Sequence, residues 1–343
     1  MKTWVFRVPP RIPATTIMIV LVAAGTAGCT GGGSPGSTSM SALSDKALTS
    51  VRVAAIPTAD LAGLYIAQNN GLFAQAGLHV TIEKIASSQA VITAQESGGV
   101  DIGAGSYIPY IAAEAGGAKF RILAEASTLG PDTRVLVTAT DSAIDNVSQL
   151  AGKKIGVNGT NSIGTLLISE LLTAHGISPA KVTFVTDQGG FPAMPANLAK
   201  GEYAAAFLAE PYVTVAGENY GESILADLDE GAASDFPIDG YVATQTWATA
   251  HPQVVAAFVR AVEEGQAIAE SNRLATESAL GKSDSLKSAV TSLMSLPRYP
   301  VGPVNEARIQ REATSMLQYG MLTDQVAAEV DNGSLVRSMI RGG

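Results

Sequence analysis

Residues 51–104 read VRVAAIPTADLAGLYIAQNNGLFAQAGLHVTIEKIASSQAVITAQESGGVDIGA, and this stretch decides the fold. Short runs rich in β-branched residues alternate here with amphipathic runs, which predicts βαβ units and a largely parallel sheet. The expected elements are strands over 51–56, 78–84 and 100–104, and helices over 61–75 and 88–96. This first unit therefore has the order β-α-β-α-β.

The same order recurs later in the chain. Its expected elements are strands over 154–157, 181–186 and 203–208, and helices over 162–175 and 192–200. Two similar units predict two similar lobes. If the extended segments 134–140 and 240–247 cross between the lobes, the hinge has two strands. We therefore expect an α/β protein in which 49–138 and 241–343 form lobe 1 and 139–240 form lobe 2.

The N-terminus has the pattern of an export signal. Residues 1–28 carry three basic residues and no acid, then a short apolar run over 17–24, then small residues before Cys29. The apolar run is too short to span a bilayer, which needs roughly 20 apolar residues. The following segment, 29–48, is rich in Gly, Ser and Thr and is expected to be a flexible tether.

Cys29 is the only cysteine, so no intramolecular disulfide can form. The segment Thr26-Ala27-Gly28-Cys29 resembles a bacterial lipobox, in which the cysteine is acylated with diacylglycerol and becomes the new N-terminus. This resemblance implies an extracytoplasmic protein anchored to the cell membrane by lipid on Cys29. The alternative is a chance cysteine after an ordinary cleavage site.

Composition and charge exclude several classes of function. The net charge is −9 and the pI about 4.9, whereas nucleic-acid binding needs a cluster of Lys and Arg on one face. No His, Cys and Asp cluster has metal-ligand spacing, and neither a GxSxG elbow nor a P-loop occurs. We therefore expect no metal, no cofactor and no catalysis.

Four phrases of the sequence resemble a known family. They are LAGLYIAQNNGLFAQAGLHV (61–80), SGGVDIGAGS (97–106), LAGKKIGV (150–157) and GEYAAAFLAEPY (201–212). They look like the NMT1/THI5-like and SsuA/TauA-like solute-binding proteins of ABC importers. The resemblance implies a type II periplasmic-binding fold that captures a sulfonate, taurine, nitrate or a pyrimidine for a permease and its ATPase. The alternatives are an enzyme of the pyrimidine-synthase branch and an exported solute sensor.

The ligand is expected in the crevice beyond the carboxyl ends of the strands. Candidate ligand-binding residues in the loops there are Asp60, Ser88, Ser106, Tyr107, Thr160, Asn161, Ser162, Phe191, Glu210 and Tyr212. Hydroxyls and amides before a helix can receive a polar oxygen, although Asn161 and Ser162 could equally serve only as caps. For each aromatic ring the alternative is lobe packing, and for each acid it is a salt bridge.

These loops contain acids but neither Lys nor Arg. An ionised phosphate or sulfonate would then depend on helix ends and hydroxyls alone. The sequence therefore favours a ligand with amine donors, or a neutral one.

Overall fold

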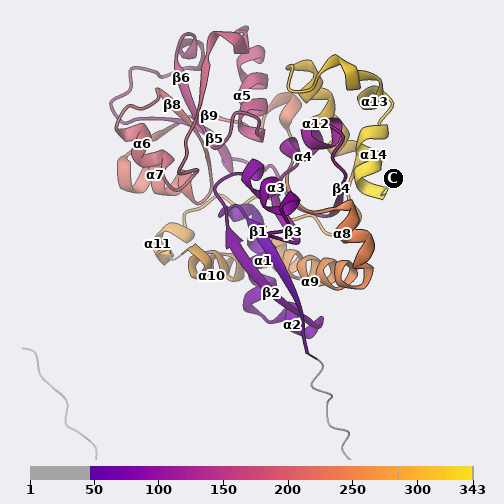
Figure 1. Cartoon of the computed structure of the whole chain (residues 1–343). Helices are drawn as coiled ribbons and strands as arrows, with labels where there is room; N and C mark the ends of the chain where they lie inside the picture. Colours follow the sequence, from indigo (N-terminus) through magenta and orange to yellow (C-terminus); the bar gives the residue numbers. More distant parts are fainter. Residues whose placement is uncertain (1–46, 285, 342–343) are drawn as a thin grey trace, which may run out of the picture. The chain divides into compact units, whose positions relative to one another are not determined.

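The computed structural model describes residues 47–284 and 286–341, whose strands form two five-stranded sheets (Figure 1). The first has the order β2-β1-β3-β10-β4, formed by β1 (Thr49–Ala55), β2 (Leu78–Lys84), β3 (Ile102–Ser106), β4 (Phe120–Thr128) and β10 (Pro237–Thr244). The second has the order β7-β6-β8-β5-β9, formed by β5 (Arg134–Thr138), β6 (Lys154–Val157), β7 (Thr183–Thr186), β8 (Ala205–Ala209) and β9 (Ser223–Asp227).

The two sheets share one topology. In each, three parallel strands are followed by one antiparallel strand, which is β10 in the first sheet and β5 in the second. This correspondence is what the two repeated units predict. We call the first sheet with its helices the first lobe, and the second sheet with its helices the second lobe.

Helices cover both sheets. Those of the first repeat are α1 (Ala62–Asn69), α2 (Leu72–Gln75), α3 (Ser88–Glu96) and α4 (Tyr107–Ala115), and those of the second are α5 (Ile163–Ala174), α6 (Met194–Ala199) and α7 (Tyr212–Tyr220). The C-terminal part forms α8 (Gln245–Ala250), α9 (Pro252–Ser271), α10 (Arg273–Asp284), α11 (Ser288–Thr291), α12 (Glu306–Gln318), α13 (Ala327–Asp331) and α14 (Ser334–Arg341). As expected, α9 and α14 pack onto the first lobe, against α1 and β4.

Two expectations about local structure need correction. The single helix expected over 61–75 is divided into α1 and α2, because Gly71 adopts a left-handed conformation with φ of 71° between them. The chain crosses between the sheets at 129–133 and 228–236, so β5 and β10 begin after the crossings rather than forming them. Residues 134–138 thus belong to the second sheet and 237–240 to the first, unlike the expected lobe limits.

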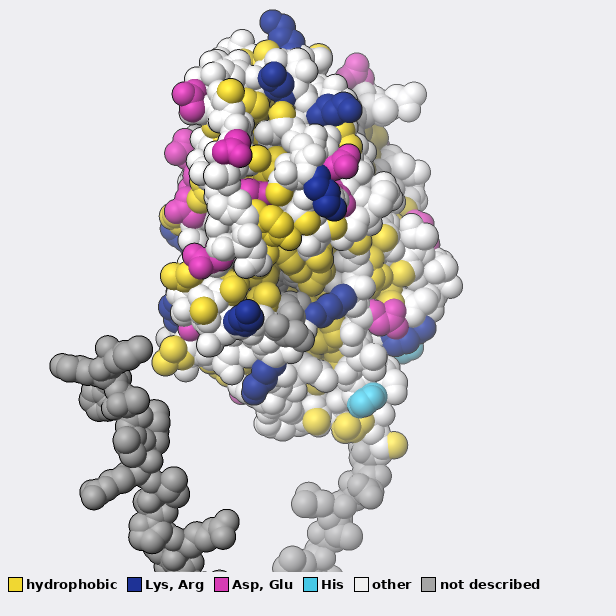
Figure 2. Space-filling model, turned by 90° about the vertical axis from the view of Figure 1, so that its left-hand side faces the viewer, with side chains coloured by type: hydrophobic (Ala, Val, Ile, Leu, Met, Phe, Trp, Pro, Cys, Tyr) yellow, Lys and Arg dark blue, Asp and Glu magenta, His cyan; other side chains and the backbone are white. Residues whose placement is uncertain are grey.

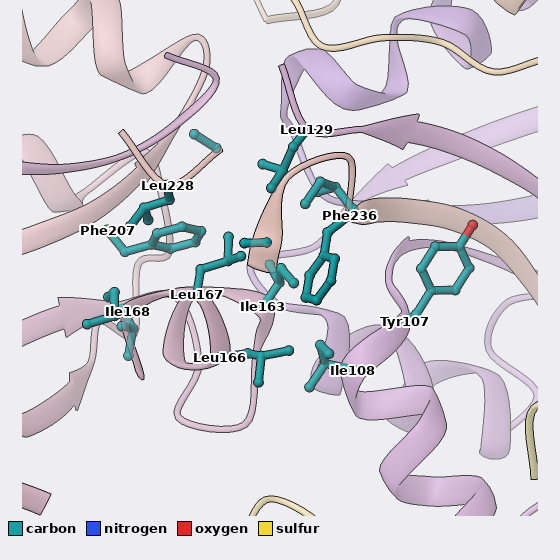
Figure 3. Packing of buried hydrophobic residues seen from close by; sticks show 14 of the residues in the cluster. Tyr107, Ile108, Leu129, Ile163, Leu166, Leu167, Ile168, Phe207, Leu228 and Phe236 are labelled. Carbon is teal, nitrogen blue, oxygen red and sulfur yellow. The ribbon is translucent and has the colours of Figure 1, made fainter. Parts of the chain in front are cut away.

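The hydrophobic core is divided between two clusters. One lies under α1 and α9 and takes Val51, Val53 and Ala55 from one face of β1. The other begins on the opposite face of β1 and continues into the second lobe. Figure 3 shows Phe236, from the second crossing, facing Ile163 of α5 with Ile108 of α4 close by. Apolar packing therefore extends from one lobe into the other beside the crossings.

Several expectations fall on residues outside this description. They are the signal segment 1–28, Cys29 and the tether up to residue 46. Among the helices of residues 47–284 and 286–341, none is both long and apolar enough to cross a membrane.

On the face shown in Figure 2, positive and negative side chains are mixed, and neither sign forms a continuous patch. Lys and Arg side chains on that face are dispersed among acidic and hydrophobic ones. A phosphate backbone would find no continuous basic track there.

Candidate functional site

A cavity of about 350 Å³ lies between the two lobes. The first lobe contributes the segments that follow β1, β2 and β3, and the second contributes those that follow β6 and β7. The lining residues are Ile56, Thr58, Ser87, Ser88, Gln89, Ser106, Pro109, Arg134, Asn158, Gly159, Thr160, Asn161, Ser162, Ile163, Thr186, Phe191 and Asp239. The cavity is therefore at the carboxyl ends of the parallel strands, where open α/β sheets generally bind their ligands.

Two helices of the first lobe begin at this cavity with serines. Ser87 caps α3 and Ser106 caps α4, and each hydroxyl oxygen accepts a backbone N–H of its helix at 3.3 Å. The hydroxyl of Ser88 accepts the backbone N–H of Ser106 at 3.0 Å. Each hydroxyl still has its own O–H proton, which can be donated into the cavity.

The second lobe presents the start of α5. Ser162 precedes this helix, and Thr165 Oγ1 accepts the Ser162 backbone N–H at 3.2 Å. The Ser162 hydroxyl and the Asn158 amide oxygen are buried in the cavity wall and have no hydrogen-bond partner in the described structure. Buried polar atoms in folded proteins are almost always paired, so these two require an explanation.

A buried ion pair lies at one side of the cavity, with its arginine in the lining. Arg134, the first residue of β5, donates from Nη2 to Asp60 Oδ2 at 2.5 Å and from Nη1 to the Thr133 carbonyl oxygen at 3.0 Å. Asp60 also accepts the Ser127 hydroxyl at 2.8 Å. The Arg134 Nε–H is buried without a partner and belongs to a residue that lines the cavity.

The cavity wall also contains the carboxyl of Asp239, on β10. Burial, with a smaller contribution from the nearby Asp60, raises its pKa to about 8, although the Arg134 charge and the Thr58 hydroxyl act in the opposite direction. The protonated form of Asp239 is therefore favoured more than that of an exposed aspartate.

Six predicted site residues line the cavity: Ser88, Ser106, Thr160, Asn161, Ser162 and Phe191. Asp60 lies behind the wall, paired with Arg134. Glu210 lies outside it, where its carboxylate accepts N–H and O–H of Thr214 and the N–H of Ser295.

The two remaining predicted residues, Tyr107 and Tyr212, are also outside the lining. Tyr107 is completely buried, because it is the first residue of a helix rather than part of a loop, and its ring packs against Gly240. Tyr212 stacks on Phe191 with ring centroids 6.1 Å apart, which supports the cavity wall from behind.

Arg134 and Asp239 were missed by the sequence analysis, and the expectation of a site without Arg is wrong. Both residues belong to strands rather than to the loops after them. A signal did exist, since RVLVT and PIDGYVAT each place one charged residue among apolar neighbours. A charge in a buried strand is costly unless it is paired or functional.

The family model described as NMT1/THI5 like matches residues 58–272. The chain belongs to this family. Among curated proteins, the NMT1/THI5-like chain is 29% identical to the taurine-binding periplasmic protein of Escherichia coli (strain K12) over 203 residues, 59% of this chain and 61% of that protein. It is 33% identical to the 4-amino-5-hydroxymethyl-2-methylpyrimidine phosphate synthase THI11 of Saccharomyces cerevisiae over 123 residues, 36% of this chain and 35% of that enzyme. It thus spans about three fifths of the first relative and a third of the second.

Solved structures share the fold of this NMT1/THI5-like chain. The alkanesulfonate-binding protein SsuA from Xanthomonas axonopodis pv. citri, bound to MOPS, has a TM-score of 0.70 at 19% identity, over 80% of this chain and 95% of SsuA. The periplasmic nitrate-binding protein NrtA from Synechocystis PCC 6803 has a TM-score of 0.70 at 17% identity, over 85% of this chain and 88% of NrtA. The expected periplasmic-binding-protein fold with two lobes is confirmed.

Proposed function

We propose that this protein is the solute-binding component of an ABC-type importer, which captures a small polar organic solute between its lobes for a permease. The observation that carries this proposal is one cavity into which both lobes bring polar groups, four of them buried and without a hydrogen-bond partner in the described structure. These are Thr58 Oγ1, Asn158 Oδ1, Ser162 Oγ and Arg134 Nε.

The energetic argument starts from these atoms. A buried polar group without a hydrogen bond costs about 1–3 kcal/mol. A ligand or ordered water that satisfies these four atoms recovers this free energy, so the cavity is suited to a polar occupant. A volume of about 350 Å³ has room for a small solute and is at the lower end of ligand pockets in general.

Contacts between the lobes on two sides of the cavity support capture by closure. The Ala59 N–H of the first lobe donates to the Glu210 carbonyl oxygen of the second at 2.8 Å. Gly190 of the second lobe lies against Ala86 of the first, closely enough that a Cβ on Gly190 would be 2.7 Å from the Ala86 carbonyl oxygen. Rigid-body opening at the crossings would break these contacts and admit a solute.

The partial match to a synthase suggests catalysis as the alternative. The cavity lining instead combines hydroxyls, amides, one guanidinium and one carboxyl, a set suited to recognition. His79, His175 and His251 are exposed and do not belong to this lining. Among the described residues, no group of His, Cys, Asp and Glu is arranged to hold a metal ion.

The location of the protein is part of the proposal. The lipobox-like segment before Cys29 supports export and lipid anchoring at the cell membrane. Replacing Cys29 by Ser would then release the protein into the soluble extracytoplasmic fraction or stall the precursor. Unchanged retention of C29S in membranes would refute lipidation at this residue.

A thermal-shift screen tests the binding function. The purified chain is heated with sulfonates, nitrate, pyrimidines, amines and amino acids, each over a range of concentrations. A bound solute at 100 times its Kd stabilises the folded state by about 2.7 kcal/mol. The double variant N158A/S162A serves as the matched control and should lose most of this shift. If no compound of the screen stabilises the wild-type protein, the proposed function fails.

A further inference from the structure

A second cavity, of about 330 Å³, lies apart from the proposed solute cavity and shares none of its lining residues. The second lobe borders it with β5, α7 and the start of β9, and the first lobe with the segment that follows α11. Helix α11 lies beside α7 (Figure 1). The segment after α11 belongs to the first lobe, because Met294 is buried in the core cluster under α1 and α9. Both lobes therefore build the second cavity.

Every charged side chain in the lining of the second cavity is acidic. The four acids are Asp132, Glu210, Glu218 and Glu222, and none of the described residues that line the cavity is Lys, Arg or His. Asp132 and Glu218 are exposed to solvent. Glu210 is buried, but its carboxylate accepts three hydrogen bonds from neighbouring residues. The lining thus contains negative charge without a positive residue to balance it.

Glu222 is the acid whose place in this lining requires an explanation. It is 8% exposed, and neither of its carboxylate oxygens has a hydrogen-bond partner in the described structure. Burying a carboxylate is costly unless it is paired and hydrogen-bonded. Burial accordingly raises the pKa of Glu222 to about 7, where the carboxyl can still ionise near neutral pH. A positive group beside the carboxylate would offset the cost of its burial.

The rest of the second cavity has apolar side chains from both lobes. Leu293 of the first lobe and Ile224 of the second are 59% and 48% exposed, while Val137 and Val213 are buried. Covering exposed apolar surface with an aliphatic chain is favourable in proportion to the area removed from water. Ligand pockets typically combine apolar walls with a few polar groups, and this volume is at their lower end.

We infer that the second cavity binds a small aliphatic organic cation, in which a guanidinium or primary ammonium on a short alkyl chain pairs with the Glu222 carboxylate. Asp132 and Glu218 add to the negative potential that attracts the cation, and the alkyl chain lies against Ile224 and Leu293. A metal ion does not suit the same residues, since no group of His, Cys, Asp and Glu in the described part of the chain is arranged to hold one. This site is separate from that of the transported solute.

The affinity of this site should depend on pH through Glu222. The ionisable groups around it are Asp132, Glu210 and Glu218 in the lining and Tyr203, whose pKa the charge of Glu222 helps to raise. All of them are acids, so none competes with the ligand as a positive partner. A guanidinium stays charged throughout the neutral range. Affinity should therefore increase as Glu222 ionises, by up to about tenfold from pH 6 to pH 8, and level off above pH 8.

Calorimetric titration of the purified chain with n-butylguanidinium tests the inference, and n-butylurea is the matched neutral probe. The two compounds have the same shape, but only the first is charged. Phosphate buffer is used because an amine buffer would compete, and about 150 mM salt screens general attraction to a chain of net charge −9. At pH 8 the cation should bind at least about ten times more tightly than the urea. Equal binding of the two compounds, or no binding of the cation, overturns the inference.

Two variants test the residues that define the site, and melting curves verify that each folds. E222Q keeps the shape of the side chain and should lose about tenfold affinity for the cation together with its pH dependence. The control is E96Q, which neutralises an exposed glutamate at the end of α3 and should bind like wild type. L293A should bind n-butylguanidinium several-fold more weakly and methylguanidinium unchanged, because only the longer chain reaches Leu293. Unchanged affinity in E222Q, or an equal loss in E96Q, overturns the inference.

The double variant N158A/S162A shows which cavity the cation occupies. It lacks two polar groups of the solute cavity and should bind n-butylguanidinium like wild type. Loss of cation binding in this variant would locate the cation in the solute cavity, which overturns the inference and leaves the proposed function intact. Intact cation binding together with a solute screen that finds no ligand counts against the proposed function alone.

Discussion

Arg134 and Asp60 form a buried ion pair that joins the two sheets, with Nη2 and Oδ2 2.5 Å apart and side chains 3% and 1% exposed. Asp60 belongs to a short 3₁₀ helix after β1, whereas Arg134 opens β5. The pair therefore links one lobe to the other beside the cavity. Its removal is a direct test of how much the lobe contact contributes to stability.

Arg134→Met should destabilise the empty protein by about 3–5 kcal/mol, because it leaves the Asp60 carboxylate buried without a counter-charge. Urea denaturation measures this loss. The control is Arg52→Met, which breaks a pair of similar length, 2.8 Å to Asp101, whose arginine is 45% exposed. An exposed pair contributes about 1 kcal/mol or less. Equal losses in the two variants would contradict the role given to Arg134.

Gly190→Ala should weaken solute binding by holding the lobes apart. The added Cβ would be 2.7 Å from the Ala86 carbonyl oxygen, so the backbones of the two lobes must separate. The control is Gly176→Ala, since Gly176 also has a positive φ, 71° against 62°, but has no atom within 4 Å of the added Cβ. Both variants carry the strain of a left-handed alanine.

The measurement for this pair is affinity for the solute found in the screen, with small-angle scattering of the bound state. Only the Gly190 variant should bind several-fold more weakly and scatter as a more open particle. If both variants bind like wild type, the Ala86 contact has no part in closure.

Ser162→Ala should reduce affinity by about 1–3 kcal/mol while leaving the unfolding free energy almost unchanged, because the hydroxyl has no protein partner to lose. Ser169→Ala on the same helix is the matched control. Its hydroxyl donates to the Thr165 carbonyl oxygen at 2.7 Å, away from the cavity lining. The Ser169 variant should lose stability and keep its affinity. The opposite pattern would mean that Ser162 only caps the helix.

Glu222 should make stability depend on pH. Burial raises its pKa from 4.5 to about 7, and neither carboxylate oxygen has a hydrogen-bond partner in the described structure. The folded state thus favours the protonated form, so stability is lost as pH rises from 4.5 through 7. Glu222→Gln should match wild type in melting temperature at pH 4.5 and exceed it at pH 8.

Thermal melts from pH 4.5 to pH 8 measure this difference. Glu218→Gln is the control, since Glu218 is exposed on the neighbouring helix α7. A Glu222 variant whose advantage over wild type is the same at every pH would show that ionisation of this residue is not the cause.

Much of the fold could be predicted, because the spacing of apolar residues indicates helix or strand and glycines mark the ends of these elements. The boundaries of β2, α3 and β6 are the same in the sequence interpretation and in the structure. Helix α4 was not anticipated, since its sequence YIPYIAAEA starts with bulky residues and has a proline in its first turn. Proline is tolerated at this end of a helix, so it marked a start rather than a loop.

The candidate site was harder to predict than the fold. Hydroxyls at helix starts were recognisable, because capping residues directly precede helical patterns. Arg134 and Asp239 could not be placed from periodicity, since both lie within strands and reach the cavity only through the way the two sheets meet. Tyr107 was misplaced because it is the first residue of helix α4 and its ring is buried in the core.

The position of β10 between β3 and β4 has a consequence for the order of folding. β4 ends at Thr128 and β10 begins at Pro237, so the first sheet remains split into two parts until the chain has returned from the second lobe. The second sheet, in contrast, is built from the uninterrupted segment 134–227. Local contacts close faster than distant ones, so pulse-labelled hydrogen exchange should protect β5 to β9 before β10. Until then β3 and β4 lack their shared neighbour, and their unpaired edges are open to pairing with other chains.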